Sequence, residues 1–164
     1  MTGIRAVVVD PRDTAGVLPR RDRKAMKRAL RASSCAVSFT IDRSFFGGKI
    51  EGADTAFSGG SDSIPSTSLE LIKGCSAICA LHPDEATEAA VDLAIRYRKP
   101  WAVVPCCIFA RLFPNRRLKS GAQVSSHNDF LQYLQEKQKG AKVKKLDFVG
   151  KNDCVYFFGP YDDE

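Results

Sequence analysis

Two short stretches of the sequence carry side chains that can do chemistry, and each directly follows an apolar run. The first is His82-Pro83-Asp84-Glu85, and the second is Pro105-Cys106-Cys107. A histidine and a carboxylate can orient or deprotonate a nucleophile, and a thiol becomes a nucleophile when a nearby base or helix N-terminus lowers its pKa. The sequence therefore predicts a catalytic site that contains His82, Asp84, Cys106 and Cys107.

Each of these residues also has a purely structural explanation. Asp84 can cap a helix that starts after Pro83, and His82 can be a histidine whose ring nitrogens are satisfied by neighbouring groups. The two cysteines can line a pocket or pack as small apolar side chains. These alternatives stay open, and pocket lining is favoured over covalent catalysis for the cysteines.

The cysteine spacing predicts reduced, mostly buried thiols and no bound metal. The six cysteines form no CxxC pair, the spacing typical of structural zinc sites. Cys75 and Cys79 are separated by strand-like residues, and the histidines, His82 and His127, would join a metal site only through the tertiary fold. Thiols of an intracellular chain are expected to be reduced.

The excess positive charge is confined to the N-terminal part of the chain. The net charge is +6, and residues 1–31 contain nine Lys or Arg against three Asp, so the remaining chain is neutral. This segment can bind a polyanion, such as RNA or a phosphate-bearing ligand, or it can be a solvated helix face. The first hypothesis assigns RNA contacts to the basic residues Arg20, Arg21, Arg23, Lys24, Lys27, Arg28 and Arg31.

Alternating strands and helices must position these groups. Apolar and β-branched runs predict strands at residues 4–9, 35–41, 76–82 and 101–104. Apolar residues at helical spacing predict helices at residues 21–33, 85–98 and 126–139. Residues 76–104 thus form a βαβ unit, whose strands are parallel neighbours. Ligands bind beyond the carboxyl ends of such strands, where both chemical stretches and Asp10 are found.

The C-terminal part predicts an antiparallel hairpin with strands at residues 142–149 and 154–158. Residues 42–68 contain Gly pairs and a polar tract, so a long loop is expected there, and residues 159–164 form an acidic, frayed tail. The order of elements predicts one doubly wound α/β domain over residues 1–158, with a mostly parallel sheet.

The motifs at the strand ends resemble a eukaryotic protein family whose members look like class I S-adenosylmethionine (SAM) methyltransferases. The resemblance is carried by LHPDEATE at residues 81–88 and KPWAVVPCC at residues 99–107, and it continues through residues 113–118, 130–134 and 146–152. The tandem cysteines are also similar, more loosely, to those of tRNA 2′-O-methyltransferases. The resemblance implies a Rossmann-like, mostly parallel sheet with a C-terminal antiparallel hairpin, and SAM as the cofactor.

The resemblance also implies roles for single residues. The second strand of this fold ends in an acid that accepts hydrogen bonds from the ribose of SAM, and Asp10 matches it, although Asp-Pro is also a common start of a turn. Arg12, His82 and Pro83 are expected to line the same cofactor site. The loop with His82 and Asp84 would face the transferred methyl group. Cys106 would line that cleft, because methyl transfer needs positioning more than covalent help.

One part of the family pattern is missing. A class I methyltransferase starts with a strand and a Gly-rich turn, which here would lie before Ile4, and the pairs Gly47-Gly48 and Gly59-Gly60 come too late. The chain is therefore expected to be a fragment or a shortened homologue without the first strand. Its loss would leave two strand edges unpaired, which predicts a covering protein partner or an altered topology at residues 35–68.

The leading hypothesis is a SAM-dependent methyltransferase that acts on RNA, either active or truncated and inactive. The alternative is a non-catalytic methyltransferase-like module that binds RNA or a protein partner. A third hypothesis is a cysteine-dependent enzyme that uses Cys106 or Cys107 with His82. No Walker A, GxGxxG or GxSxG motif is present, which argues against a P-loop nucleotidase, a Rossmann dehydrogenase and a serine hydrolase.

The sequence also bears on location. No apolar run approaches the length of about 18 residues that a membrane span needs, so no membrane contact is expected. The N-terminal apolar run, residues 6–9, is too short for a signal peptide. An intracellular protein, cytoplasmic or nuclear, is therefore expected.

Overall fold

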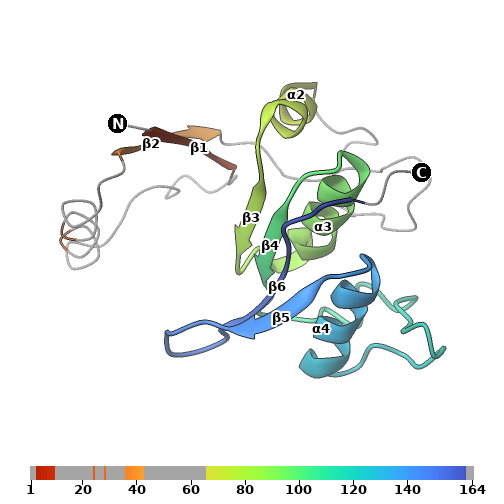
Figure 1. Ribbon diagram of the computed structural model, residues 1–164. Coiled ribbons are helices and arrows are strands. Elements are labelled where there is room, and N and C mark those ends of the chain that lie inside the picture. Colours follow the sequence, from red (N-terminus) through yellow and green to blue (C-terminus); the bar gives the residue numbers. More distant parts are fainter. Residues whose placement is uncertain (1–2, 10–23, 25–27, 29–35, 43–65, 162–164) are drawn as a thin grey trace. The chain divides into compact units, whose positions relative to one another are not determined.

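The computed structural model describes residues 3–9, 24, 28, 36–42 and 66–161 (Figure 1). The chain divides into two compact units, residues 1–46 and residues 47–164, and each is treated by itself. The strands form two separate sheets, one of two strands and one of four. The protein is thus a mixed α/β structure.

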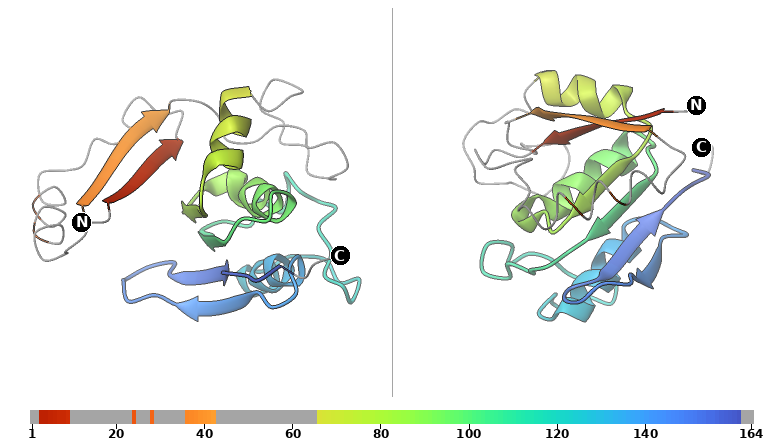
Figure 2. Two further views of the ribbon diagram at one scale, coloured as in Figure 1. Left: turned by 45° about the horizontal axis from the view of Figure 1, so that its top comes forward. Right: turned by 90° about the vertical axis from the view of Figure 1, so that its left-hand side faces the viewer.

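The N-terminal unit contains a pair of parallel strands, which lie side by side in Figures 1 and 2. β1 (Gly3–Val9) pairs with β2 (Ala36–Asp42) in register from end to end. Both strands lie where the sequence predicts them, because β-branched residues favour the extended backbone. Lys24 and Arg28 are helical and exposed, in agreement with the predicted helix at these two positions.

The C-terminal unit contains a four-stranded mixed sheet with the strand order β3-β4-β6-β5. β3 (Ile78–Leu81) and β4 (Trp101–Val104) are parallel neighbours, which confirms the predicted βαβ unit. β6 (Asp153–Phe157) lies between β4 and β5 (Lys142–Lys145) and is antiparallel to both. The predicted C-terminal hairpin is therefore present, with its second strand inside the sheet.

Two helices cover one face of this sheet. α3 (Thr87–Arg96) connects β3 to β4, and α4 (His127–Glu136) precedes β5. Strand residues alternate between the two faces, and one face presents the almost fully buried side chains Trp101, Val103, Val155 and Phe157. Val91, Leu93 and Ala94 of α3 and Phe130 and Leu134 of α4 complete this core. None of the described helices is long and apolar enough to cross a membrane.

The helix boundaries follow from local chemistry. Ser126 caps α4 in a capping box, since its hydroxyl accepts a hydrogen bond from the Asp129 N–H while the Asp129 carboxylate accepts one from the Ser126 N–H. The predicted helix at 85–98 is shorter than expected. A 3₁₀ turn, η1 (Asp84–Ala86), precedes α3, and the helix ends before Arg98, whose φ is +52°.

Three further expectations need correction. The sequence predicts a loop over residues 42–68, but Ser66 to Ser68 already belong to a helix, α2 (Ser66–Gly74), which the polar tract before it hides. The strand predicted at 142–149 ends at Lys145. There, Asn152 Nδ2 donates to the carbonyls of Leu146 and Phe148, both at 2.7 Å, and closes a loop instead. Residues 43–65 lie outside the described part.

The predicted frayed tail is wrong at Tyr161. Its hydroxyl lies 2.7 Å from the Lys99 carbonyl and 3.3 Å from the Ala94 carbonyl, and its ring packs edge-on against Phe157. Tyr161 therefore connects the C-terminal end of α3 to β6 of the sheet. Residues 162–164 lie outside the described part.

We predict that Tyr161→Phe lowers the free energy of unfolding by about 1 kcal/mol, because the ring keeps its packing while two carbonyls lose a half-buried donor. Urea unfolding at equilibrium measures this difference. Tyr156→Phe is the matched control, with a change within about 0.5 kcal/mol. Equal stability of the two variants would show that the tail hydroxyl contributes nothing.

Candidate functional site

The two chemical stretches meet at the carboxyl ends of β3 and β4. The strands pair in register up to Leu81 and Val104, and the His82 N–H extends the ladder to the Val104 carbonyl at 3.0 Å. One residue beyond Pro105, the Cys106 thiol donates a hydrogen bond to Asp84 Oδ1 at 3.1 Å. The parallel pairing thus joins side chains that are 22 residues apart in the sequence.

His82 connects this place to the hairpin. Its Nε2 lies 2.8 Å from the carbonyl oxygen of Lys151, and its ring lies near Phe148 with the centroids 6.3 Å apart. His82 and Asp84 have φ of +49° and +50°, which turn the chain sharply after β3. The interpretation of His82 as a histidine satisfied by its neighbours is therefore met at Nε2. Among the described residues, the hydrogen-bond partner of the Cys106 thiol is Asp84 and not His82.

Asp84 does not cap α3, so the structural alternative for this residue is wrong. The N-cap of α3 is Ala86 and that of η1 is Pro83, and neither start has a side-chain cap. The backbone carbonyl of Asp84 instead accepts a hydrogen bond from Thr87 Oγ1 at 2.7 Å. The exposed Asp84 carboxylate is left for contacts across the strand ends.

The geometry disfavours covalent catalysis by Cys106. Partial burial and the hydrogen bond to Asp84, with a further contribution from Cys107, raise the pKa of the Cys106 thiol to about 12. The thiol is therefore protonated near neutral pH, and His82, the predicted activating base, is bound elsewhere. Cys106 is half-buried and Cys107 is exposed beside it, and their predicted role in lining a pocket stays a prediction.

The same cluster is where a metal ion could bind. One ligand atom each from Asp84, Cys106 and Cys107 lie within 4.8 Å of one another, a thiolate and carboxylate set that suits zinc. The sequence predicts no metal. His127 lies apart from this cluster, with Nε2 3.7 Å from Asp153 Oδ2.

The described cysteines are less buried than predicted. Five free cysteines are described, of which only Cys154 is buried, while Cys79 and Cys107 are exposed. The Cys75 thiol donates to the Ile72 carbonyl at 3.2 Å. Cys35 lies outside the described part.

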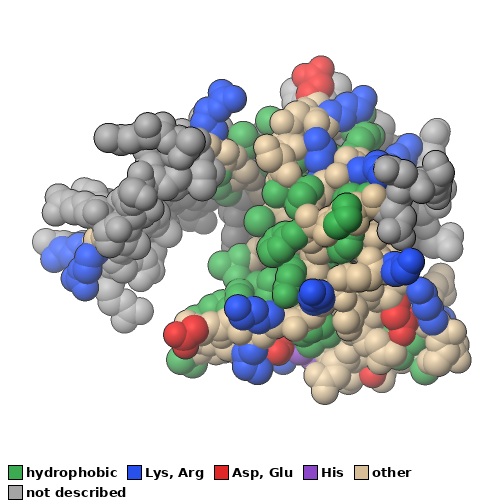
Figure 3. Space-filling view, viewed as in Figure 1, with side chains coloured by type: hydrophobic (Ala, Val, Ile, Leu, Met, Phe, Trp, Pro, Cys, Tyr) green, Lys and Arg blue, Asp and Glu red, His purple; other side chains and the backbone are tan. Residues whose placement is uncertain are grey.

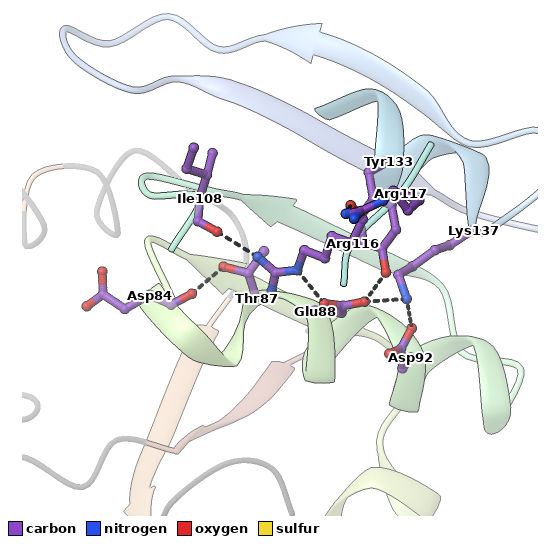
Figure 4. A network of polar contacts seen from close by, with 9 residues as sticks. All are labelled: Asp84, Thr87, Glu88, Asp92, Ile108, Arg116, Arg117, Tyr133 and Lys137. Atoms are coloured by element: carbon purple, nitrogen blue, oxygen red, sulfur yellow. Dashed lines mark hydrogen bonds and ion pairs between the residues drawn. The ribbon is translucent and has the colours of Figure 1, made fainter. Parts of the chain in front are cut away.

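A buried ion network is centred on Glu88, four residues after Asp84 in the chain (Figure 4). Glu88 of α3 is 1% exposed, and its carboxylate contacts Arg116 Nε at 2.7 Å, Lys137 Nζ at 2.7 Å and the Tyr133 hydroxyl. Lys137 also contacts Asp92 at 2.8 Å. Both carboxylate oxygens of Glu88 are thus paired, which a buried charge requires.

Arg116 extends this network to the segment that follows the cysteines. Its Nη1 donates to the Ile108 carbonyl at 2.7 Å, and its guanidinium lies 3.8 Å from the ring centroid of Phe113 and 4.6 Å from that of Phe130. The network therefore fixes the chain just beyond Cys107 against α3 and α4.

The sequence analysis misses this role of Glu88 and Arg116. There, both residues stand only inside segments that carry the family resemblance, Glu88 in residues 81–88 and Arg116 in residues 113–118. One feature of the sequence could have revealed this role: Glu88 stands among the small apolar residues of the helix face. An acid in such a position is expected to be buried and to need a cation as its partner.

The structure brings together His82, Pro83, Asp84, Cys106 and Cys107 in one region. Asp10 and Arg12, the expected cofactor contacts of the first unit, lie outside the described part. So do the basic residues other than Lys24 and Arg28, namely Arg20, Arg21, Arg23, Lys27 and Arg31. Their predicted roles stay predictions.

Comparison with known proteins gives no assignment: no family model, curated protein or solved structure matches this chain. The site is therefore interpreted from its own geometry and chemistry.

We predict that Glu88→Gln lowers the free energy of unfolding by about 3–5 kcal/mol, because Arg116 would keep a buried charge without a carboxylate partner and Lys137 would keep only Asp92. Tyr133→Phe, a milder change in the same network, should cost about 1–2 kcal/mol. The matched control, Glu85→Gln on the adjacent turn, should stay within about 0.5 kcal/mol. Denaturant unfolding measures all three, and an effect of Glu88→Gln equal to that of the control would contradict the network.

The buried Glu88 carboxylate should also make the free energy of unfolding depend on pH. Burial by itself would raise the pKa of Glu88, but Lys137, Tyr133 and Arg116 outweigh it and hold the pKa below its ordinary value of 4.5. A lowered folded-state pKa stabilises the fold above the unfolded-state pKa, and this stabilisation is lost as the pH falls below 4.5. The stability gap between wild type and Glu88→Gln should therefore narrow below that pH.

Alkylation tests the state of Cys106. In a Cys107→Ser background, iodoacetamide near neutral pH should modify Cys106 more slowly than free cysteine, because partial burial and the Asp84 carboxylate still raise the pKa of its thiol. Asp84→Asn removes the negative charge beside the thiol and should speed its modification by about tenfold. Peptide mass spectrometry over time gives both rates. Rapid modification of Cys106 in the wild-type setting would revive the cysteine-dependent hypothesis.

Proposed function

We propose that this chain is a methyltransferase-like protein that binds SAM at the carboxyl ends of β3 and β4 and transfers the methyl group to RNA. The observation that carries the proposal is the contact of Asp84 with Cys106. It unites the two motifs on which the resemblance to class I methyltransferases rests. Ligands of α/β proteins bind at such strand ends.

The sheet topology supports this proposal. β6, the last strand of the chain, is antiparallel to its neighbours and lies between β4 and β5, so β5 forms the edge of the sheet. The class I methyltransferase fold implied by the resemblance also has an antiparallel hairpin at its C-terminal end.

The residues at the strand ends fit the reacting part of SAM. Its sulfonium is positively charged, and the exposed carboxylate of Asp84 offers a negative group at this place. When bound, SAM supplies an electrophilic methyl group. Asp84 Oδ1 is held by Cys106, while its second oxygen can accept a hydrogen bond from the nucleophilic hydroxyl or amine of a substrate and orient it.

The other side chains would shape the site. His82, held by the Lys151 carbonyl, would fix the loop that faces the methyl group, and Cys106 and Cys107 would form a wall against the substrate. The resemblance assigns the ribose of SAM to Asp10, with Arg12 and Pro83 nearby. RNA is the favoured substrate because the chain carries a net charge of +6, and Lys24 and Arg28 of its basic segment are exposed.

A non-catalytic module that binds RNA or a protein partner is the second candidate. The observation that favours it is that the polar groups at the described strand ends are engaged within the protein: the Lys151 carbonyl holds His82 Nε2, and the raised pKa of Cys106 keeps its thiol protonated. A module of this kind would use the same fold for binding, without SAM.

Calorimetric titration of the full chain with SAM and with S-adenosylhomocysteine separates the two candidates. We predict measurable binding of both, weakened about tenfold by Asp84→Asn, since a hydrogen bond to a charged group contributes about 1.5–3 kcal/mol. Glu85→Gln is the matched control and should bind both compounds like wild type. No binding heat with either compound would remove the methyltransferase proposal and leave the binding module.

A further inference from the structure

The face of the four-stranded sheet that points away from the core presents aromatic side chains at the C-terminal end of β6. Strand residues alternate between faces, so Tyr156 points away from the core residues Val155 and Phe157. Phe158 follows two residues later and is 69% exposed. The rings of Tyr156 and Phe158 lie together, with the centroids 5.0 Å apart and a tilt of 38° between the planes.

Lysines border these rings on the neighbouring strand. Lys142 of β5 is paired directly with Tyr156, and Lys144 is paired with Cys154, so both lysines share the face of Tyr156. Both are exposed. In Figure 3, blue side chains adjoin the green ones that cover the strands of this unit.

The hairpin adds further positive charge. Residues 140–152 contain four lysines, Lys142, Lys144, Lys145 and Lys151, against the single acid Asp147. Within the described residues, only Lys145 of these four forms an ion pair, with Asp153 at 2.9 Å. The remaining positive charge faces solvent and attracts an anion.

This combination fits one kind of partner. Exposed rings on a sheet stack with unpaired bases, and lysines beside them neutralise the phosphates that link those bases. A base-paired duplex keeps its bases stacked inside the helix, so no base is available to stack on the exposed rings. Residues two apart on a strand are about 7 Å apart, which is close to the reach of one nucleotide in an extended strand.

We propose that Lys142, Lys144, Tyr156 and Phe158 form a binding platform for single-stranded RNA. This platform is separate from the basic N-terminal segment, to which the sequence assigns RNA contacts. The proposal deepens the proposed function, on which it rests for the role of the bound RNA as substrate.

The platform and the strand-end site belong to the same four-stranded sheet. β5 runs in the same direction as β3 and β4, because both β4 and β5 are antiparallel to β6. The turn that leaves β5 therefore lies at the same edge of the sheet as His82 and Asp84, and the Lys151 carbonyl contacts His82. Lys144 lies towards this edge, whereas Tyr156, which pairs with Lys142 at the start of β5, and Phe158 lie towards the opposite edge. A strand of RNA on the platform would therefore run along β6, between the two edges of the sheet.

Fluorescence anisotropy of the full chain with a labelled oligouridine, measured over a range of salt concentrations, tests the platform. Lys142→Gln with Lys144→Gln should weaken binding about fivefold or more and lower the dependence on salt, because each lost phosphate contact reduces the salt slope by about 0.7. Phe158→Ser should weaken binding by at least about fivefold with an unchanged salt slope, because it removes stacking and no charge.

Two controls make the test specific. Lys73→Gln removes an equally exposed lysine from α2 and should bind like wild type. A duplex of the same length should bind more weakly than the single strand, and its affinity should not respond to Phe158→Ser. Equal affinities of the double lysine variant and Lys73→Gln, or a loss of binding only when Lys24 and Arg28 are replaced, would overturn the platform.

The outcomes also separate this inference from the proposed function. Oligouridine binding is measured without SAM, so a platform that responds to Phe158→Ser stands even if no SAM binding is found. Conversely, SAM binding with an oligouridine affinity that none of the platform variants changes would retain the methyltransferase and reject the platform. Binding of anionic lipid vesicles in preference to oligouridine would likewise reject it.

Discussion

The buried carboxylate of Glu88 is the constraint on which the C-terminal unit depends. A charge that is 1% exposed must be paired on both oxygens, and its partners come from two further parts of the chain: Arg116 from the segment after β4, and Tyr133 and Lys137 from α4 and its C-cap. Pairing them draws the segment after β4 and the helix α4 against α3. Since Arg116 also holds the Ile108 carbonyl, the same ion pair determines where the tandem cysteines can lie.

The strand ends receive their geometry from the sheet. Parallel pairing of β3 with β4 places both carboxyl ends at one edge, and the reversed strand β6 brings the hairpin loop to that edge as well. His82 then ties the loop to β3 through the Lys151 carbonyl. The site is thus assembled from three loops whose positions are all determined by strand direction and by the core behind them.

The two faces of this sheet have different chemistry for a physical reason. The face against α3 and α4 buries Trp101, Val103 and Phe157, which supply the apolar area that stabilises the unit. The opposite face is free to carry side chains that are poor core residues, such as Lys142 beside Tyr156. The proposed RNA platform therefore lies on the side of these strands that faces away from the core formed with α3 and α4.

The sequence by itself determined the local structure of the well-patterned segments: the strand at 101–104, the βαβ unit and the C-terminal hairpin follow from β-branched runs, helical spacing and turn residues, all of which act over short distances. It also located both halves of the site, because chemistry at α/β strand ends follows from strand order. It could not decide that Asp84 contacts Cys106 rather than capping a helix. Nor could it show that a helix, α2, follows the polar tract, or that Tyr161 packs against Phe157. Only the tertiary structure decided these, because each depends on partners far along the chain, as does the pairing of Glu88 with Arg116, which no local pattern of residues encodes.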